Sequence, residues 1–176
     1  MIKKNESDAG GSSSVRHGAS APATDDSIIH DASAVGSSRG DFSDAAADIS
    51  LLEQARDAAK GAYVPYSEFP VGAAIRTMEG RIITGCNIEN ASYGLTNCAE
   101  RTASFRMIAE SGDVPRIDTV AIVGLKAEPC WPCGACRQVL REFGCSRVIV
   151  EKESRPFVLP FESILPFSFG PEDLEG

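Results

Sequence analysis

The chain gathers four of its six cysteines in two short stretches, TNCAERTA at 96–103 and EPCWPCGACRQ at 128–138. The apolar spacing that follows each stretch predicts helices over 98–110 and 134–143, and Gly144 closes the second one. Cys98 and Glu100 therefore lie at the start of one helix, and Cys133 and Cys136 lie at the start of the next. If the two helix starts converge, three sulfurs and a carboxylate meet at one point.

The segments around these two helices alternate between helix and strand patterns. Apolar residues spaced by three and four predict a helix that begins at Asp48 and ends before Pro65. Patterns of buried or alternating apolar residues predict five strands, and the turn Glu79-Gly80 joins the first two of them into a hairpin. The expected strands are 71–78, 81–86, 120–125, 147–150 and 156–159. This order predicts an α/β fold, a mixed sheet with helices on both faces.

Composition limits the classes of partner. The net charge of −8 argues against a nucleic-acid polymer, because phosphate binding requires a basic face. No apolar run is long enough to span a membrane, and no apolar segment follows Lys3 and Lys4 as a secretory signal would require. We therefore expect a cytoplasmic protein that acts on a small molecule. In a reducing compartment, clustered cysteines bind metal or take part in chemistry more often than they form disulfides.

The N-terminal segment, residues 1–47, has a different composition from the rest of the chain. Gly, Ser and Ala supply 24 of its 47 positions, and Phe42 is its one aromatic residue. Such a segment buries too little apolar surface to offset the entropy of ordering it. We expect a disordered, low-complexity tail at 1–47 and a single folded domain at 48–176.

Both histidines, His17 and His30, fall in the expected tail. The expected domain therefore has no histidine for a nucleophile–base pair or for a histidine zinc site. Three thiolates, from Cys98, Cys133 and Cys136, could instead hold Zn²⁺ and leave a fourth position open, as catalytic zinc sites require. Three thiolates overcompensate a 2+ ion, and Arg101 could offset the excess by donating a hydrogen bond to a ligand sulfur.

Other interpretations of the same residues remain open at this point. Asn97 and Glu100 have the spacing of a capping box, which would make Glu100 structural. Cys98 could be a small buried apolar residue. Cys130 could be a fourth ligand that closes a structural zinc site with no open position. Cys86 and Cys145 fit a core or surface thiol without a catalytic role. Cys-Ala-Glu followed by Pro-Cys-x-x-Cys is the more specific pattern, because it has the form of the zinc deaminase motif with cysteine in place of histidine.

Several ordered motifs extend this pattern, and through them the sequence resembles the cytidine deaminase family, in its small homotetrameric form. The motifs are VPYSEFPVGAA at 64–74, GCNIENASY at 85–93, NCAERTA at 97–103, PCGACRQV at 132–139 and SFGPEDL at 168–174. The resemblance implies a three-layer α/β/α sandwich with a five-stranded mixed sheet. It also implies one zinc ion per subunit and hydrolytic deamination of cytidine and 2′-deoxycytidine in pyrimidine salvage. The alternative is a related zinc deaminase that acts on another cytosine compound, such as a blasticidin-type antibiotic.

The resemblance also implies roles for individual residues. Cys98, Cys133 and Cys136 would ligate zinc, and Glu100 would move protons between water, ring nitrogen and leaving group. Asn87 and Glu89 would bind the ribose, Phe69 would stack on the pyrimidine, and the backbone at Ala99 would contact the base. Tyr93 and Phe169 would help to complete the pocket of a neighbouring subunit in a homotetramer. Without the resemblance, Asn87 would be a turn residue and Phe69 an ordinary core residue. Trp131 stands where the family usually has a small residue.

Overall fold

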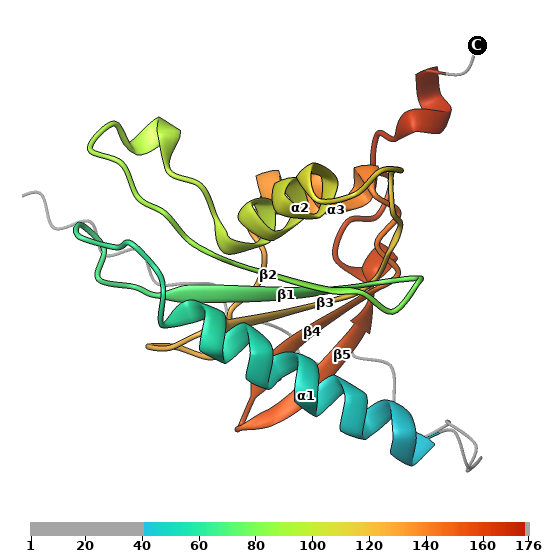
Figure 1. The fold of residues 1–176 in the computed structure, drawn as a ribbon, viewed down its shortest axis with the longest axis horizontal. Coiled ribbons are helices and arrows are strands. Elements are labelled where there is room, and N and C mark those ends of the chain that lie inside the picture. Colours follow the sequence, from blue (N-terminus) through green and yellow to red (C-terminus); the bar gives the residue numbers. More distant parts are fainter. Residues whose placement is uncertain (1–40, 175–176) are drawn as a thin grey trace, which may run out of the picture. The chain divides into compact units, whose positions relative to one another are not determined.

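A five-stranded mixed sheet forms the centre of the protein in a computed structural model that describes residues 41–174 (Figure 1). The strand order is β2-β1-β3-β4-β5, and only β3 and β4 run parallel. The strands are β1 Val71–Thr77, β2 Ile82–Cys86, β3 Ile117–Gly124, β4 Arg147–Lys152 and β5 Arg155–Pro160. The predicted mixed sheet is confirmed, and so is the hairpin, whose turn uses Gly80 at φ +84°.

Helices cover both faces of this sheet. Helix α1, Asp41–Ala59, crosses one face, and α2, Ala99–Ala109, and α3, Gly134–Glu142, lie over the other (Figure 1). Side chains of a strand alternate between the two faces. In β4, Val148 and Val150 accordingly join the core under α2 and α3, whereas Ile149 joins the core under α1. The three-layer α/β/α sandwich is therefore confirmed.

Helix α1 begins at Asp41, earlier than the expected start at Asp48. Residues 41–47, which the composition assigned to the tail, are helical. The sequence DFSDAAA explains the difference, because alanine has the highest helix propensity and aspartates near a helix N-terminus complement its dipole. The rest of the expected tail, residues 1–40, lies outside the described residues.

An ionic cluster around the buried Asp48 joins α1 to the sheet. Asp48 is 5% exposed, and its carboxylate lies 3.2 Å from Arg147 Nη2 and 3.7 Å from Arg76 Nη2. Arg76 also pairs with Asp118 of β3 at 2.8 Å. The charges of the two carboxylates and the two guanidiniums cancel, as charges removed from water require. These polar residues also interrupt the apolar pattern of β3, and this explains why the sequence placed the start of that strand at Val120 instead of Ile117.

Helix α2 packs directly on β2 at Gly85. A Cβ atom added at Gly85 would lie 2.4 Å from Ala103 N and 2.8 Å from Ala99 O, both of which belong to the helix backbone. No side chain longer than hydrogen fits there without displacing α2. Because Ala99 directly follows Cys98, this contact also fixes the height of Cys98 above the sheet.

We expect Gly85→Ala to lower the free energy of unfolding by about 2–4 kcal/mol, the upper range of overpacking in a core. Gly112→Ala is the matched control, since nothing lies within 4 Å of a Cβ added there. Denaturant unfolding of both variants measures the difference. Equal stability of the two variants would show that α2 can move without cost.

Within residues 41–174, no helix combines the length and the apolar character that a membrane crossing demands.

Candidate active site and metal centre

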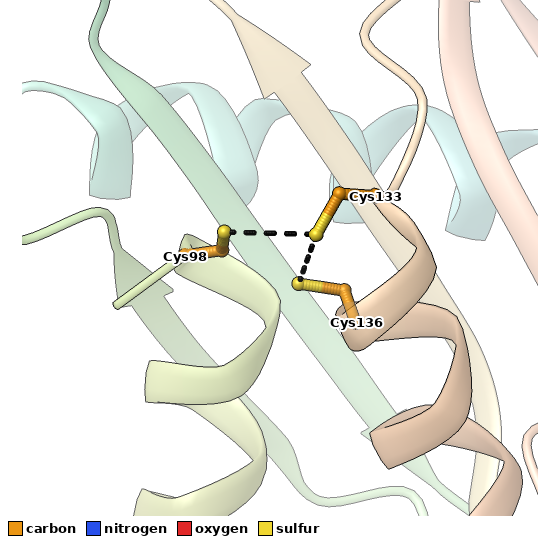
Figure 2. A group of neighbouring side chains, drawn as sticks. All are labelled: Cys98, Cys133 and Cys136. Carbon is orange, nitrogen blue, oxygen red and sulfur yellow. Dashed lines mark hydrogen bonds between the residues drawn. The ribbon is translucent and has the colours of Figure 1, made fainter. Parts of the chain in front are cut away.

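Three cysteine sulfurs meet where the starts of α2 and α3 converge (Figure 2). Cys98 is the N-cap of α2, Cys133 is the N-cap of α3, and Cys136 lies in the first turn of α3. Cys133 Sγ lies 3.9 Å from Cys98 Sγ and 3.5 Å from Cys136 Sγ. All three sulfurs lie within 4.8 Å of one another. The predicted convergence of the two helix starts is therefore confirmed.

The spacing of the sulfurs fits a tetrahedral zinc ion. Zinc–thiolate bonds of about 2.3 Å at tetrahedral angles separate two sulfurs by about 3.8 Å. The observed 3.9 Å and 3.5 Å lie on either side of that value. Three soft sulfur donors also select zinc, because magnesium and calcium prefer oxygen ligands. The cluster thus fits one zinc ion per chain, with a fourth coordination position that these three residues leave free.

Cys130 does not belong to the cluster. Among the described residues, the group of sulfur, carboxylate and imidazole donors close enough to share a metal consists of Cys98, Cys133 and Cys136. Cys130 packs against the end of β3, where its Sγ lies 3.2 Å from a Cβ built on Gly124. Burial, followed by the nearby charges of Glu100 and Cys98, raises the pKa of Cys130 to about 11. The closed site with four cysteines therefore has no support in the geometry.

The thiolate form of Cys98 is favoured by its surroundings. A hydrogen bond from Cys136 is the largest cause that lowers the pKa of Cys98, to about 5, and Arg101 contributes further. Neither N-cap cysteine makes a side-chain capping hydrogen bond, so the free N–H groups of both helix starts remain available to the sulfurs. The positive ends of the two helix dipoles add to this stabilisation.

Arg101 lies beside the ligand sulfur, as the charge argument predicted. Its Nη2 donates to Thr96 O at 2.9 Å and lies 3.8 Å from Cys98 Sγ. Its buried Nε has no hydrogen-bond partner in the part of the chain that the structure describes. The guanidinium is thus held next to the sulfur cluster by a backbone carbonyl. Its single positive charge balances the formal −1 of Zn²⁺ with three thiolates.

Glu100 is a buried carboxyl group on the first turn of α2, 4% exposed. Burial is the main cause that raises its pKa to about 7, and the negative charge of Cys98 raises it further. The capping box that would have made Glu100 structural does not form. The N-cap is Cys98, and Asn97 Nδ2 instead donates to Thr102 Oγ1 at 3.0 Å. A carboxyl group that titrates near neutral pH suits proton transfer.

Two residues expected to bind ribose also hold the loop that contains Phe69. Asn87 Nδ2 donates to Phe69 O at 2.9 Å, and Asn87 Oδ1 accepts from Val71 N at 2.8 Å. The Glu89 carboxylate accepts from the backbone N–H groups of Tyr66 and Ser67, at 2.9 and 3.2 Å. An amide and a carboxylate each keep further hydrogen-bonding capacity after these contacts. The resemblance implied substrate contacts at these residues but gave no sign of this second role.

A cavity of about 410 Å³ lies against this loop, and its lining includes Glu89 and Tyr93. Tyr66, Ser67 and Thr96 complete the lining. Tyr66 and Tyr93 meet edge to face, with ring centroids 5.8 Å apart. Sequence reasoning missed Tyr66 and Thr96, although Tyr66 lies within the quoted motif at 64–74. Ala99 is fully buried directly after Cys98, whereas Phe169 is not in this lining and is 60% exposed on the C-terminal segment.

Cys86 and Cys145 do not belong to the sulfur cluster, and the Trp131 side chain contacts β5. Cys145 is buried in the core, as expected, and Cys86 is half-buried and donates to Gly61 O at 3.3 Å. Trp131 packs edge to face on Phe157 of β5, with ring centroids 6.0 Å apart. The large indole is thus accommodated against the edge strand of the sheet.

Comparisons with known proteins agree with this site. A family model described as the cytidine and deoxycytidylate deaminase zinc-binding region matches residues 46–152. The chain is 56% identical over 94 residues to a cytidine deaminase of Halalkalibacterium halodurans, covering 52% of this chain and 68% of that protein. It is 46% identical over 124 residues to a cytidine deaminase of Mycobacterium tuberculosis, and the match covers 70% of this chain and 90% of that protein. A crystal structure of cytidine deaminase from Burkholderia pseudomallei superposes with a TM-score of 0.63 at 44% identity. The match covers 69% of this chain and 98% of that one.

Proposed function

The chain belongs to the cytidine and deoxycytidylate deaminase family, and on this basis we propose that it removes the 4-amino group of cytidine and 2′-deoxycytidine by zinc-dependent hydrolysis. The products are uridine or 2′-deoxyuridine, together with ammonia. One observation supports this proposal most strongly. Three sulfurs at zinc spacing leave one coordination position free, and a buried carboxyl group with a pKa of about 7 lies on the same helix start.

Glu100 is the group proposed to move protons. A zinc ion held by Cys98, Cys133 and Cys136 supplies Lewis acidity, which makes water a nucleophile near neutral pH. Glu100 takes a proton from the attacking water and gives it to ring N3, and this makes C4 electrophilic. A bond forms between C4 and the water oxygen. Glu100 then takes the remaining proton from the new C4 hydroxyl and passes it to the amino group, the C4–N bond breaks, and ammonia leaves as the C4 carbonyl forms.

The loop around Phe69 is proposed to bind the nucleoside. Phe69 stacks on the pyrimidine, Asn87 and Glu89 bind the ribose hydroxyls, and the backbone at Ala99 contacts the base. The hydrogen bonds from Asn87 and Glu89 to the loop backbone support this arrangement, because they link ribose recognition to the position of the stacking ring. Arg101, next to Cys98, balances the charge of the metal centre.

We expect the enzyme to prefer nucleosides over nucleotides. The described lining of the pocket offers the Glu89 carboxylate and neither lysine nor arginine, so a 5′-phosphate would meet a negative charge without a cation to pair with. Like-charge contact at a binding site costs several kcal/mol, so kcat/KM for cytidine 5′-monophosphate should be at least about 100-fold below that for cytidine. Ultraviolet assays with both substrates measure the ratio, and comparable values would refute the preference.

We further propose that the chain forms a homotetramer in the cytoplasm and serves pyrimidine salvage. Exposed aromatic side chains on two segments support an assembly, because contacts with other subunits would bury them. Tyr93 is 74% exposed beside the pocket, and Phe167 and Phe169 are exposed on the C-terminal segment. In the tetramer, Tyr93 and Phe169 help to complete a neighbouring pocket. Light scattering should give four times the 18.6 kDa mass of one chain; a stable monomer with full activity would contradict the shared pocket.

One purified sample tests the central proposal. It should contain one zinc ion per chain and convert cytidine with a loss of absorbance that chelation abolishes and added zinc restores. A blasticidin-type antibiotic and free cytosine assayed in parallel identify the competing substrate classes. Zinc-loaded protein that turns over the antibiotic and not cytidine would replace the proposed substrate, and protein without zinc would overturn the mechanism.

A further inference from the structure

One face of α3 holds the C-terminal arm, which we define as residues 164–174. Gln138 Nε2 donates to Phe169 O at 3.0 Å, and Arg141 Nε donates to Ser168 Oγ at 2.9 Å. Arg141 also forms an ion pair with Glu172. The arm is therefore fastened to α3, the helix whose N-cap and first turn provide two of the three sulfurs (Figure 1).

Arg137, also on α3, donates hydrogen bonds both to the arm and to the zinc-binding loop, which we define as residues 125–133 between β3 and α3. Its Nη1 donates to Ile164 O at 2.6 Å, and its Nε donates to Pro132 O at 2.9 Å. Both accepting residues are buried, so each carbonyl would lose its partner without ready replacement by water. The guanidinium is a rigid planar fork, and two bonds from one fork fix the two carbonyls relative to each other.

The bond to Pro132 bears directly on a zinc ligand. A peptide unit is planar, so the plane that contains the Pro132 carbonyl also contains the nitrogen and Cα of Cys133. Holding the Pro132 oxygen therefore holds the backbone from which Cys133 Sγ projects. Groups one step beyond the ligand atoms commonly set the orientation of ligands in this way.

We infer that Arg137 is a positioning residue that couples the C-terminal arm to the zinc-binding loop. With Arg137 in place, docking of the arm stabilises the geometry of Cys133, and a bound metal in turn stabilises the docked arm. Coupling between two sites is reciprocal, so both effects must appear together. The inference rests on the metal centre of the proposed function and requires no particular substrate.

Hydrogen–deuterium exchange and zinc release test the coupling in the full chain. In the wild type, removing zinc with a chelator should increase deuterium uptake in peptides that cover residues 164–174. Arg137→Gln should release zinc to a competing chelator about tenfold faster or more. In that variant the arm should exchange rapidly with zinc present, and removing zinc should add little.

Three variants make the result specific. Arg155→Gln removes an equal charge from an exposed position of β5 and should match the wild type in both measurements. Gln138→Ala loses one contact to the arm and none to the loop, so it should raise uptake in the arm and leave zinc release unchanged. Arg137→Lys keeps the charge but cannot form the fork, so its zinc release should fall between Arg137→Gln and the wild type; it also serves if Arg137→Gln fails to fold.

Two results would overturn the inference. One is zinc release at the wild-type rate from folded Arg137→Gln or Arg137→Lys. The other is faster release with an unchanged response of the arm to zinc, because a purely local role would behave so. Both measurements are made without substrate. A protein that shows the coupling and fails to deaminate cytidine would therefore refute the proposed function alone.

Discussion

Glu100→Gln is expected to retain one zinc ion per chain while cytidine turnover falls by at least about 10²–10⁴-fold, the usual contribution of a positioned acid–base group. Zinc is retained because Glu100 stands outside the three-sulfur cluster. Turnover is lost because an amide of the same shape accepts no proton from water and donates none to ring N3. Metal analysis and single-turnover kinetics on one preparation measure both outcomes.

The stability of the same variant provides an internal control. Burial raises the pKa of Glu100 from 4.5 to about 7, so the folded protein binds this proton more tightly than the unfolded chain. Stability of the metal-free wild type must therefore fall, relative to Glu100→Gln, as pH rises from 4.5 to 7, by up to about 3 kcal/mol. The variant should thus be at least as stable as the wild type at neutral pH. Near-normal cytidine turnover by Glu100→Gln, or loss of zinc from it, would contradict the role of Glu100 in proton transfer.

Cys136→Ala and Cys130→Ala are expected to differ completely in zinc content. Both replace a half-buried or buried thiol with a methyl group, so their effects on packing are similar. Cys136 belongs to the sulfur cluster and Cys130 does not. Cys136→Ala should therefore bind less than about a tenth of the normal zinc and lose deamination with it, because removing one of three ligands leaves too few for a stable site.

Cys130→Ala should keep one zinc ion per chain, and its turnover should stay within about threefold of the wild type, as for substitutions away from reacting groups. Equilibrium dialysis against zinc buffers, followed by the cytidine assay, measures both variants. Loss of zinc from Cys130→Ala would indicate four thiolate ligands and no open position. The hydrolytic mechanism would then be untenable.

The parts of the fold that the sequence predicted are those whose signals are local. Gly144 and the cysteine motifs placed the ends of α2 and α3 to within one residue, and patterns of buried or alternating apolar residues located all five strands. The start of α1 was missed because alanine-rich sequence suits both a tail and a helix. The first residues of β3 were missed because the half-buried Asp118 and the buried Thr119 find their polar partners in an ionic cluster that the chain assembles from distant segments.

In the candidate site, too, local sequence signals could be predicted and contacts between distant segments could not. The meeting of Cys98, Cys133 and Cys136 could be predicted because metal-ligand chemistry restricts both residue type and spacing. The catalytic role of Glu100 stays a prediction. The second role of Asn87 and Glu89 could not, because their partners are backbone groups of Phe69, Val71, Tyr66 and Ser67, and backbone acceptors and donors are present at every position. Arg137 was hidden for the same reason, since both of its acceptors are carbonyl oxygens.

Asp48 sets a practical limit for trimming or fusing the protein at its N-terminus. A shortened version that retains this carboxylate keeps the contacts with Arg76 and Arg147. A version that starts after Asp48 leaves Arg147 half-buried on the sheet without its acidic partner. Affinity tags and reporter domains should therefore be joined upstream of Asp48, where an added sequence leaves the ionic clamp intact.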